Sequence, residues 1–341
     1  MKTIVAIILC LSCCVQGFAQ KIIVVAKKGK ADFSTIQGAI NSLTDSSATP
    51  RVIYIKNGVY NEKIYIEKHQ IILKGESNTQ TIITNSIARE EWRCMHNDDW
   101  GVATVNIDGN DITLQNLTII NDYGLVNQQN KNIYCSTDTT ATKIKTIKPS
   151  GHQMALRTMA ATRLRAINCV FKAFGGDTVS PWNTNFGMFY FKDCAMYGGV
   201  DFYCPRGWAY AENCTFNALV GDAAIWHDGS AVKDSKTVLK NCTFKGYNGF
   251  KLGRYHRDAQ FYLIDCLFDA NMADKDIYLV PTSNTIQWGR RVYYFNCHKK
   301  GGDYTWFANN LETAENAVEA KNINVNWVFG THWNPEINIV K

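Results

Sequence analysis

Asn213-Cys214-Thr215-Phe216 is repeated 28 residues later as Asn241-Cys242-Thr243-Phe244. Related phrases, in which an Asn or Asp precedes a cysteine, place six cysteines 25, 20, 28, 24 and 31 residues apart, at Cys169, Cys194, Cys214, Cys242, Cys266 and Cys297. A drifting period of this size is typical of a solenoid, in which each coil buries its apolar residues against the next coil. Apolar or small positions separated by one residue suit a short strand. We therefore predict an all-β chain whose strands pair coil over coil as a parallel β-helix.

The segment before the repeat predicts a cap for this solenoid. Residues 32–43 carry apolar side chains at Phe33, Ile36, Ile40 and Leu43, which is the spacing of an amphipathic helix. Because the open end of a solenoid has to be covered, we expect an N-terminal capping helix here. Residues 121–150 are polar and aperiodic, which predicts one long excursion beside the binding face. The pattern decays after Cys297 into an expected C-terminal cap.

The first residues have the features of a secretory signal. Lys2 precedes an apolar run over residues 4–15, and small residues stand at Gly17 and Ala19. The run is too short to span a bilayer. We predict a signal peptide at 1–19 and one exported domain at 20–341, periplasmic or secreted. Two cysteines near the end of the run leave a lipoprotein as the less favoured alternative.

Charge and cysteine content narrow the function classes. The net charge of +6 includes no run of Lys or Arg, so a nucleic-acid partner is not supported, whereas an acidic polysaccharide is compatible. No other long apolar run predicts a membrane span. Of the 12 cysteines, the six in the repeat are expected to be small buried hydrophobes. The cysteines outside the register, and so the only candidates for a disulfide, are Cys94, Cys135 and Cys204.

Three polar residues recur at one interval: Gln153, Asp177 and Asp201 are each 24 residues apart. If each interval is one coil, they form a column on one face, with neighbouring side chains about 4.8 Å apart. Two carboxylates at that separation cannot both ionise comfortably, so one is expected to hold a proton and the other to act as a nucleophile. Arg254 is placed to keep one of them ionised. The alternative is that these residues merely cap turns.

Six segments, in order along nearly the whole chain after residue 19, resemble the pectin methylesterases. They are Ala31-Asp32-Phe33-Ser34-Thr35-Ile36-Gln37, Gly58-Val59-Tyr60-Asn61-Glu62, Gln153-Met154-Ala155-Leu156-Arg157, Gly176-Asp177-Thr178-Val179, Val200-Asp201-Phe202-Tyr203 and Leu252-Gly253-Arg254-Tyr255-His256. The resemblance implies a right-handed, single-stranded parallel β-helix that removes the C6 methyl ester of uronic-acid residues in pectin.

The resemblance also implies roles for the column. Asp201 would be the nucleophile, and Asp177 would be the general acid toward methanol and then the base for water. Gln153 would donate to the tetrahedral oxyanion, and Arg254 would bind and orient Asp201. No cofactor is implied. After the predicted signal segment, the sequence has no His-Glu-x-x-His and no Cys-x-x-Cys, so a metal site has no support.

The departures from the family pattern concern the walls of the site. Gly176 stands where the family has a second glutamine, so one oxyanion donor is missing, and a backbone N–H or a side chain such as His227 would have to supply it. Tyr255-His256 replaces a Pro-Trp pair, and Tyr203-Cys204-Pro205-Arg206 replaces Ile-Phe-Gly-Asn. We therefore expect a methyl-esterified acidic glycan that includes branched or complex pectin.

Sugar rings stack on aromatic side chains, which suggests a set of substrate-binding residues. The candidates, including two histidines near the expected cleft, are Phe202, Trp208, Trp226, His227, Tyr255 and His256, with Trp182 in addition. The open alternatives are another pectin-active β-helix enzyme (a lyase or glycosidase) and a non-catalytic pectin-binding β-helix. We expect a monomer.

Overall fold

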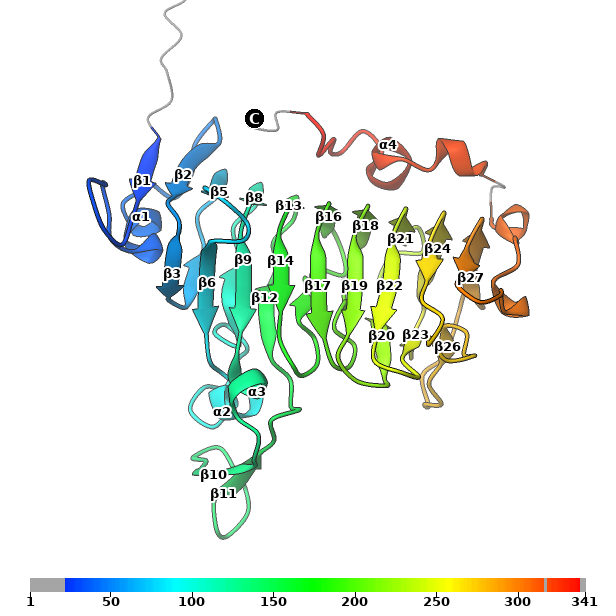
Figure 1. Ribbon diagram of the computed structural model, residues 1–341, viewed down its shortest axis with the longest axis horizontal. Helices are drawn as coiled ribbons and strands as arrows, with labels where there is room; N and C mark the ends of the chain where they lie inside the picture. The colour runs from blue at the N-terminus through cyan, green and yellow to red at the C-terminus, as the bar shows by residue number, and fades with distance from the viewer. Residues whose placement is uncertain (1–21, 316–317, 338–341) are drawn as a thin grey trace, which may run out of the picture.

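The computed structural model describes residues 22–315 and 318–337. The predicted signal segment at 1–19 lies outside the described residues. The chain winds into a parallel β-helix whose coils stack along the long axis of the molecule (Figure 1), and the strands of successive coils pair into three sheets, here called A, B and C. The predicted fold class is confirmed.

Sheet A is the longest. Its ten strands, in spatial order, are β1 (Ile23–Val25), β2 (Arg51–Ile55), β5 (Ile71–Gly75), β8 (Ile112–Gln115), β13 (Leu164–Ile167), β16 (Met188–Lys192), β18 (Trp208–Glu212), β21 (Thr237–Lys240), β24 (Gln260–Ile264) and β27 (Arg291–Phe295).

Sheet B follows sheet A after a turn in nearly every coil. Its nine strands are β3 (Gly58–Asn61), β6 (Thr81–Asn85), β9 (Thr118–Asn121), β14 (Val170–Lys172), β17 (Ala195–Gly198), β19 (Thr215–Ala218), β22 (Thr243–Gly246), β25 (Leu267–Phe268) and β28 (His298–Lys299).

Sheet C is interrupted. Four strands form its first part: β4 (Ile64–Ile66), β7 (Ala103–Ile107), β12 (Met154–Thr158) and β15 (Val179–Ser180). Three form its second part: β20 (Ala223–His227), β23 (Lys251–Tyr255) and β26 (Tyr278–Leu279). Isolated bridges from Val179 to Tyr203 and from Tyr203 to Ile225 join the two parts.

The Asn-Cys repeat marks the corner between sheets A and B. The Asn or Asp of each phrase has a left-handed backbone, with φ between 49° and 55° at Asn116, Asn168, Asp193, Asn213, Asn241, Asp265 and Asn296. Asn and Asp tolerate this conformation better than other side chains with a Cβ, which explains why they recur there. The residue after each turns inward, and the six repeat cysteines are buried and unpaired, as predicted.

Stacked phenylalanines fill the core beneath sheet B. Phe216, Phe244 and Phe268 pair in register on consecutive coils, and the rings of Phe216 and Phe244 stack with centroids 4.6 Å apart. We expect Phe244→Ala to lower the free energy of unfolding by about 3–5 kcal/mol, because it leaves a cavity between two rings. Chemical denaturation measures the loss. Leu267→Ala is the control, since Leu267 is 53% exposed, and it is expected to cost less than about 0.5 kcal/mol. A loss below about 1 kcal/mol for Phe244→Ala would contradict this account of the core.

The N-terminal helix is shorter than its apolar pattern suggests. Helix α1 (Ile36–Asn41) begins after Thr35, whose hydroxyl accepts a hydrogen bond from the Gly38 amide. Ile36, Ala39 and Ile40 are buried in the main core, so the helix covers the first coils as expected.

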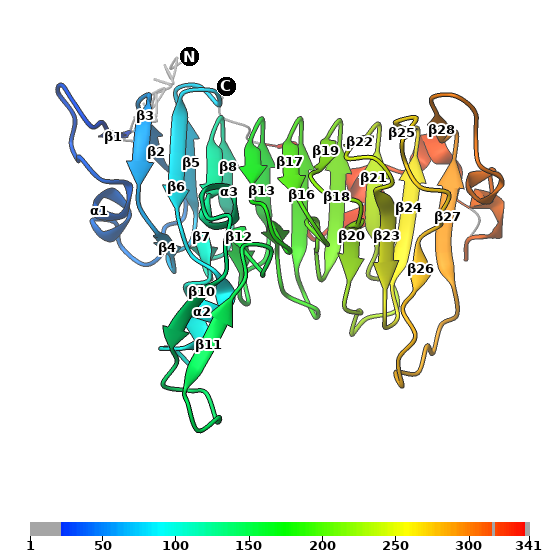
Figure 2. The same cartoon turned by 60° about the horizontal axis from the view of Figure 1, so that its bottom comes forward.

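The excursion at 121–150 contains structure that its composition did not predict. It contains α3 (Tyr123–Val126) and an antiparallel hairpin of β10 (Lys131–Tyr134) and β11 (Ile144–Ile147). The hairpin projects from the stacked coils of the β-helix (Figure 2). A disulfide from Cys94 to Cys135 ties the hairpin to the end of α2 (Arg89–Arg93). Two of the three candidate cysteines are thus paired, while Cys204 is buried and free.

The C-terminal region does more than cap the last coil. Short 3₁₀ helices lie at Thr305–Phe307, Leu311–Thr313 and Ala320–Asn322, and α4 (Val325–Phe329) follows them. The segment then runs back along the outer face of sheet A (Figure 1), where Val325, Val328 and Phe329 are buried. It reaches the earlier coils, since the Arg165 guanidinium donates to the Ile337 carbonyl at 3.3 Å.

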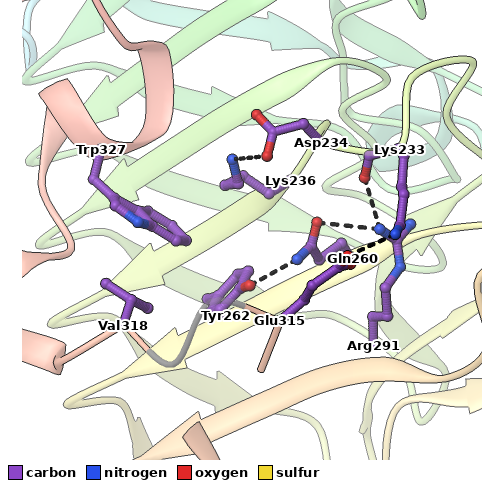
Figure 3. A pocket seen from close by; sticks show the side chains of 9 residues that line it. All are labelled: Lys233, Asp234, Lys236, Gln260, Tyr262, Arg291, Glu315, Val318 and Trp327. Atoms are coloured by element: carbon purple, nitrogen blue, oxygen red, sulfur yellow. Dashed lines mark hydrogen bonds and ion pairs between the residues drawn. The ribbon is translucent and has the colours of Figure 1, made fainter. Parts of the chain in front are cut away.

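Between this segment and sheet A lies a pocket of about 270 Å³ (Figure 3). Arg291 is buried beside it and donates to the Lys233 carbonyl at 2.6 Å, while Lys236 pairs with Asp234 at 2.9 Å. The predicted acidic pair lies away from this pocket, because Asp177 and Asp201 stand two residues before Val179 and Tyr203 in the line of sheet C. Among the described residues no helix is long and apolar enough to cross a membrane.

Candidate active site

Asp177 and Asp201 lie on consecutive coils of one wall. Each stands two residues before a member of the bridged pair Val179 and Tyr203, so the two aspartates occupy equivalent positions. Both have left-handed backbones, with φ of 58° and 51°. Asp177 is 5% exposed, and the Asp201 side chain is 13% exposed. Neighbouring strands are about 4.8 Å apart, so this placement meets the geometric requirement of the predicted pair.

Arg254 holds Asp201 through a two-pronged contact. Its Nε donates to Oδ1 at 3.0 Å and its terminal nitrogen to Oδ2 at 2.7 Å. Arg254 comes from β23, where it lies beside Trp226 of β20 in register, with its guanidinium carbon 5.3 Å from the indole centroid. A fork of this kind fixes the orientation of a carboxylate as well as its charge. The predicted contact between Arg254 and Asp201 is confirmed.

The proton affinity of Asp201 is higher than expected. Burial raises its pKa to about 6, and the carboxylates of Asp177 and Asp222 act in the same direction, while Arg254 opposes them. The sequence-based expectation placed the proton on Asp177 and left Asp201 ionised. With a pKa near 6, Asp201 still stays mostly ionised at neutral pH.

Gln153 is in the predicted column, but its amide is already used. Its backbone N–H donates to the Gly176 carbonyl at 3.0 Å, which places it beside Asp177. Its side-chain nitrogen donates to the carbonyls of Pro149 and Gly151, and its side-chain oxygen accepts from the Gly124 amide at 2.8 Å. The side chain is fully buried. In this arrangement Gln153 anchors the excursion and is not free to donate to an oxyanion, contrary to the expectation.

Some of the predicted aromatic residues lie at the surface beside the acidic pair, and others are buried in the core. Trp226 and His256 are half-buried neighbours with ring centroids 4.7 Å apart, next to the pair of Arg254 and Asp201. Because successive side chains of a strand point to opposite faces, the residues that follow Trp226 and Arg254 point inward. These are His227, which is 1% exposed, and Tyr255, which is 4% exposed. The prediction that these two line the cleft is wrong.

Three further assignments are corrected by burial and position. Phe202 is fully buried in the main core, so it cannot stack on a sugar. Trp208 lies on β18 of sheet A beneath the C-terminal segment, away from the acidic pair. His227 is 1% exposed, and its Nδ1 accepts a hydrogen bond from the Gly229 amide, so its ring is held in the interior and cannot replace the missing donor at Gly176; burial also lowers its pKa to about 4.

Sequence reasoning assigned no role to Arg206, which lies next to the pair. Its terminal nitrogen is 3.6 Å from Oδ2 of Asp177, and its Nε donates to Oδ2 of Asp228 at 2.5 Å. Its guanidinium carbon lies 4.4 Å from the centroid of the Trp182 ring. Burial opposes ionisation of Asp228, but the contact with Arg206 outweighs it and lowers the pKa of Asp228. The sequence signal that could have pointed to Arg206 was the segment at 203–206, where Tyr-Cys-Pro-Arg replaces the Ile-Phe-Gly-Asn of the family pattern.

A cavity of about 760 Å³ opens beside this cluster. It is lined on one side by Trp182, Asp228 and His256, and on the other by polar residues of the loops, including Asn284, Thr285 and Gln287. Polar side chains around an aromatic ring suit a sugar. Among residues 22–315 and 318–337, no cluster of three or more His, Cys, Asp or Glu is arranged to hold a metal ion.

Residues 22–165 match the model of the pectinesterase family. Pectinesterase A of Dickeya chrysanthemi is 37% identical over 127 residues, which are 36% of this chain and 33% of that protein. Probable pectinesterase/pectinesterase inhibitor 58 of Arabidopsis thaliana is 27% identical over 241 residues, which are 68% of this chain and 36% of that protein. The chain thus spans about a third of the length of these two relatives.

Solved structures extend the likeness in fold to most of the chain. Pectin methylesterase PemA from Erwinia chrysanthemi has a TM-score of 0.69 at 23% identity, over 92% of this chain and 98% of that one. A pectin methylesterase in complex with a hexasaccharide gives 0.69 at 22% identity with the same coverage. Residues 22–165 thus match the pectinesterase family by sequence, and the described chain shares the parallel β-helix fold of these solved structures.

Proposed function

We propose that this protein is a pectin methylesterase, which hydrolyses the C6 methyl ester of uronic-acid residues in pectic polysaccharide to a carboxylate and methanol. The observation that carries the proposal is the pair of Asp177 and Asp201 on adjacent coils, with Arg254 forked onto Asp201. The match of residues 22–165 to the pectinesterase family supports it. The hexasaccharide bound to a structural neighbour supports a polymeric sugar as the substrate.

In the proposed reaction, Asp201 attacks the ester carbonyl and forms a tetrahedral intermediate. Asp177 gives its proton to the departing methoxide, which leaves as methanol, and an anhydride remains between Asp201 and the substrate. Asp177 then takes a proton from water, and the resulting hydroxide splits the anhydride and restores both carboxyl groups. Arg254 keeps Asp201 oriented for attack.

We also propose that the substrate includes branched or complex pectin. The cavity of about 760 Å³ beside Trp182 and His256 supports this, because its wall residue Asp228 contacts Arg206, the neighbour of Asp177, and the cavity thus offers room for sugar near the acidic pair. Export to the periplasm or the medium, and a monomeric state, remain proposals from the sequence.

The test is methanol release from a panel of defined substrates. Methyl-esterified homogalacturonan and branched pectins should both release methanol, and the branched substrates should react faster. Equal rates on both would argue against a specialised cleft. A chelator should have no effect, whereas inhibition by a chelator would favour a calcium-dependent lyase. Binding without methanol release would identify a non-catalytic glycan-binding protein.

The raised pKa of Asp201 predicts the acid limb of the pH profile. The nucleophile must be ionised, and its ionised fraction falls as the pH drops through about 6, so kcat/KM should fall about tenfold per pH unit below that value. Rates measured from pH 4 to 8 test this. Arg254→Gln should move the midpoint to higher pH, because the contact with Arg254 lowers the pKa of Asp201. A wild-type profile that is flat down to pH 5 would contradict the assignment.

A further inference from the structure

Asp177 faces more positive charge than the proposed chemistry needs. Arg206 lies 3.6 Å from its Oδ2, and both side chains are at least nine-tenths buried. Arg157 also acts on Asp177 through charge, as does Asp201 with the opposite sign, whereas burial raises the pKa of the Cys204 thiol and keeps it neutral. A buried guanidinium at this distance favours the ionised carboxylate. A general acid, however, has to carry a proton.

Arg206 is held firmly by other groups. One terminal nitrogen donates to the Ser180 hydroxyl at 2.7 Å and to the Cys204 carbonyl at 3.0 Å. The Trp182 ring covers its guanidinium. Arg206 therefore cannot swing away from Asp177, so its charge has to be offset where it stands.

Asp228 is the group that offsets this charge. Its Oδ2 accepts from Nε of Arg206 at 2.5 Å and also contacts the terminal nitrogen of Arg206 that faces Asp177. Arg206 is therefore closer to Asp228 than to Asp177. Oδ1 of Asp228 accepts from the Trp226 indole and lies 3.6 Å from Nε2 of His256. Asp228 thus connects the buried guanidinium to the wall of the cleft.

We infer that Asp228 is a positioning residue for the reaction, which neutralises Arg206 and so lets Asp177 hold the proton that the departing methoxide receives. The inference rests on the proposed esterase function and deepens it. Charge compensation in a buried site is strong, because little water is present to screen the guanidinium.

The test is the alkaline limb of the pH profile for methanol release. Asp228→Asn keeps the shape of the side chain but leaves Arg206 uncompensated, so Asp177 should lose its proton earlier and the limb should move to lower pH by about one unit or more. Arg206→Gln combined with Asp228→Asn removes both charges and should bring the limb back to within about 0.3 units of wild type. Asp193→Asn, at an exposed turn with a left-handed backbone, should shift nothing.

The outcomes are separable. If the wild type releases no methanol, the proposed function itself fails. If the wild type is active and the limb of Asp228→Asn is unmoved, or if the double variant shifts as far as the single one, the inference alone is overturned. Should Asp228→Asn not fold, Arg206→Gln alone removes the positive charge that faces Asp177, and its limb should move to higher pH; an unmoved limb there would likewise refute the inference.

Discussion

Asp201→Asn should abolish methanol release, with a loss in kcat of about 10⁴-fold or more. The amide has the same shape but is neutral and is not a nucleophile, so no anhydride can form. The variant should fold, because Arg254 retains water contact after losing its partner: its side chain is 27% exposed. Methanol release under saturating pectin measures the loss, and binding to immobilised pectin should persist.

The matched control for this variant is Asp193→Asn. Asp193 also has a left-handed backbone, with φ of 54°, but it lies at the corner between sheets A and B, where other coils carry asparagine. The same chemical change there should alter kcat less than about twofold, as expected of a surface substitution. Residual activity above about 1% in Asp201→Asn would refute its role as nucleophile.

Asp177→Asn should lower kcat by about 10²–10⁴-fold, which is the usual contribution of general acid–base catalysis. Asparagine cannot protonate the departing methoxide or deprotonate the water that follows. The size of the loss should depend on the leaving group. An ester of a more acidic alcohol, such as trifluoroethanol, needs less help to leave, so its acylation step should suffer less.

Pre-steady-state kinetics with the two esters separate the roles. The burst of alcohol from the trifluoroethyl ester should be largely retained in Asp177→Asn, and it should be absent in Asp201→Asn. If the burst rates of the methyl and trifluoroethyl esters fall equally in Asp177→Asn, this residue does not act as an acid toward the leaving group.

The coil architecture could be read from the sequence because it is encoded locally. The left-handed turn at each Asn or Asp and the inward cysteine after it depend only on neighbouring residues, so a short repeated motif is enough to predict them. The pairing of Asp201 with Arg254 was predicted from the resemblance to the pectin methylesterases, because the two residues are 53 positions apart and no single coil interval joins them. Alternation along a strand could have shown that His227 and Tyr255 point inward when Trp226 and Arg254 point outward.

The sequence by itself therefore determined the β-helix and the acidic column. The tertiary structure alone decided which partners those side chains meet. The capture of the Gln153 amide by Gly124 and Gly151, the disulfide from Cys94 to Cys135 and the contact of Arg206 with Asp228 all depend on the paths of loops between coils. Loop paths follow from long-range packing and not from a local period, because residues distant in sequence meet only after the coils have stacked.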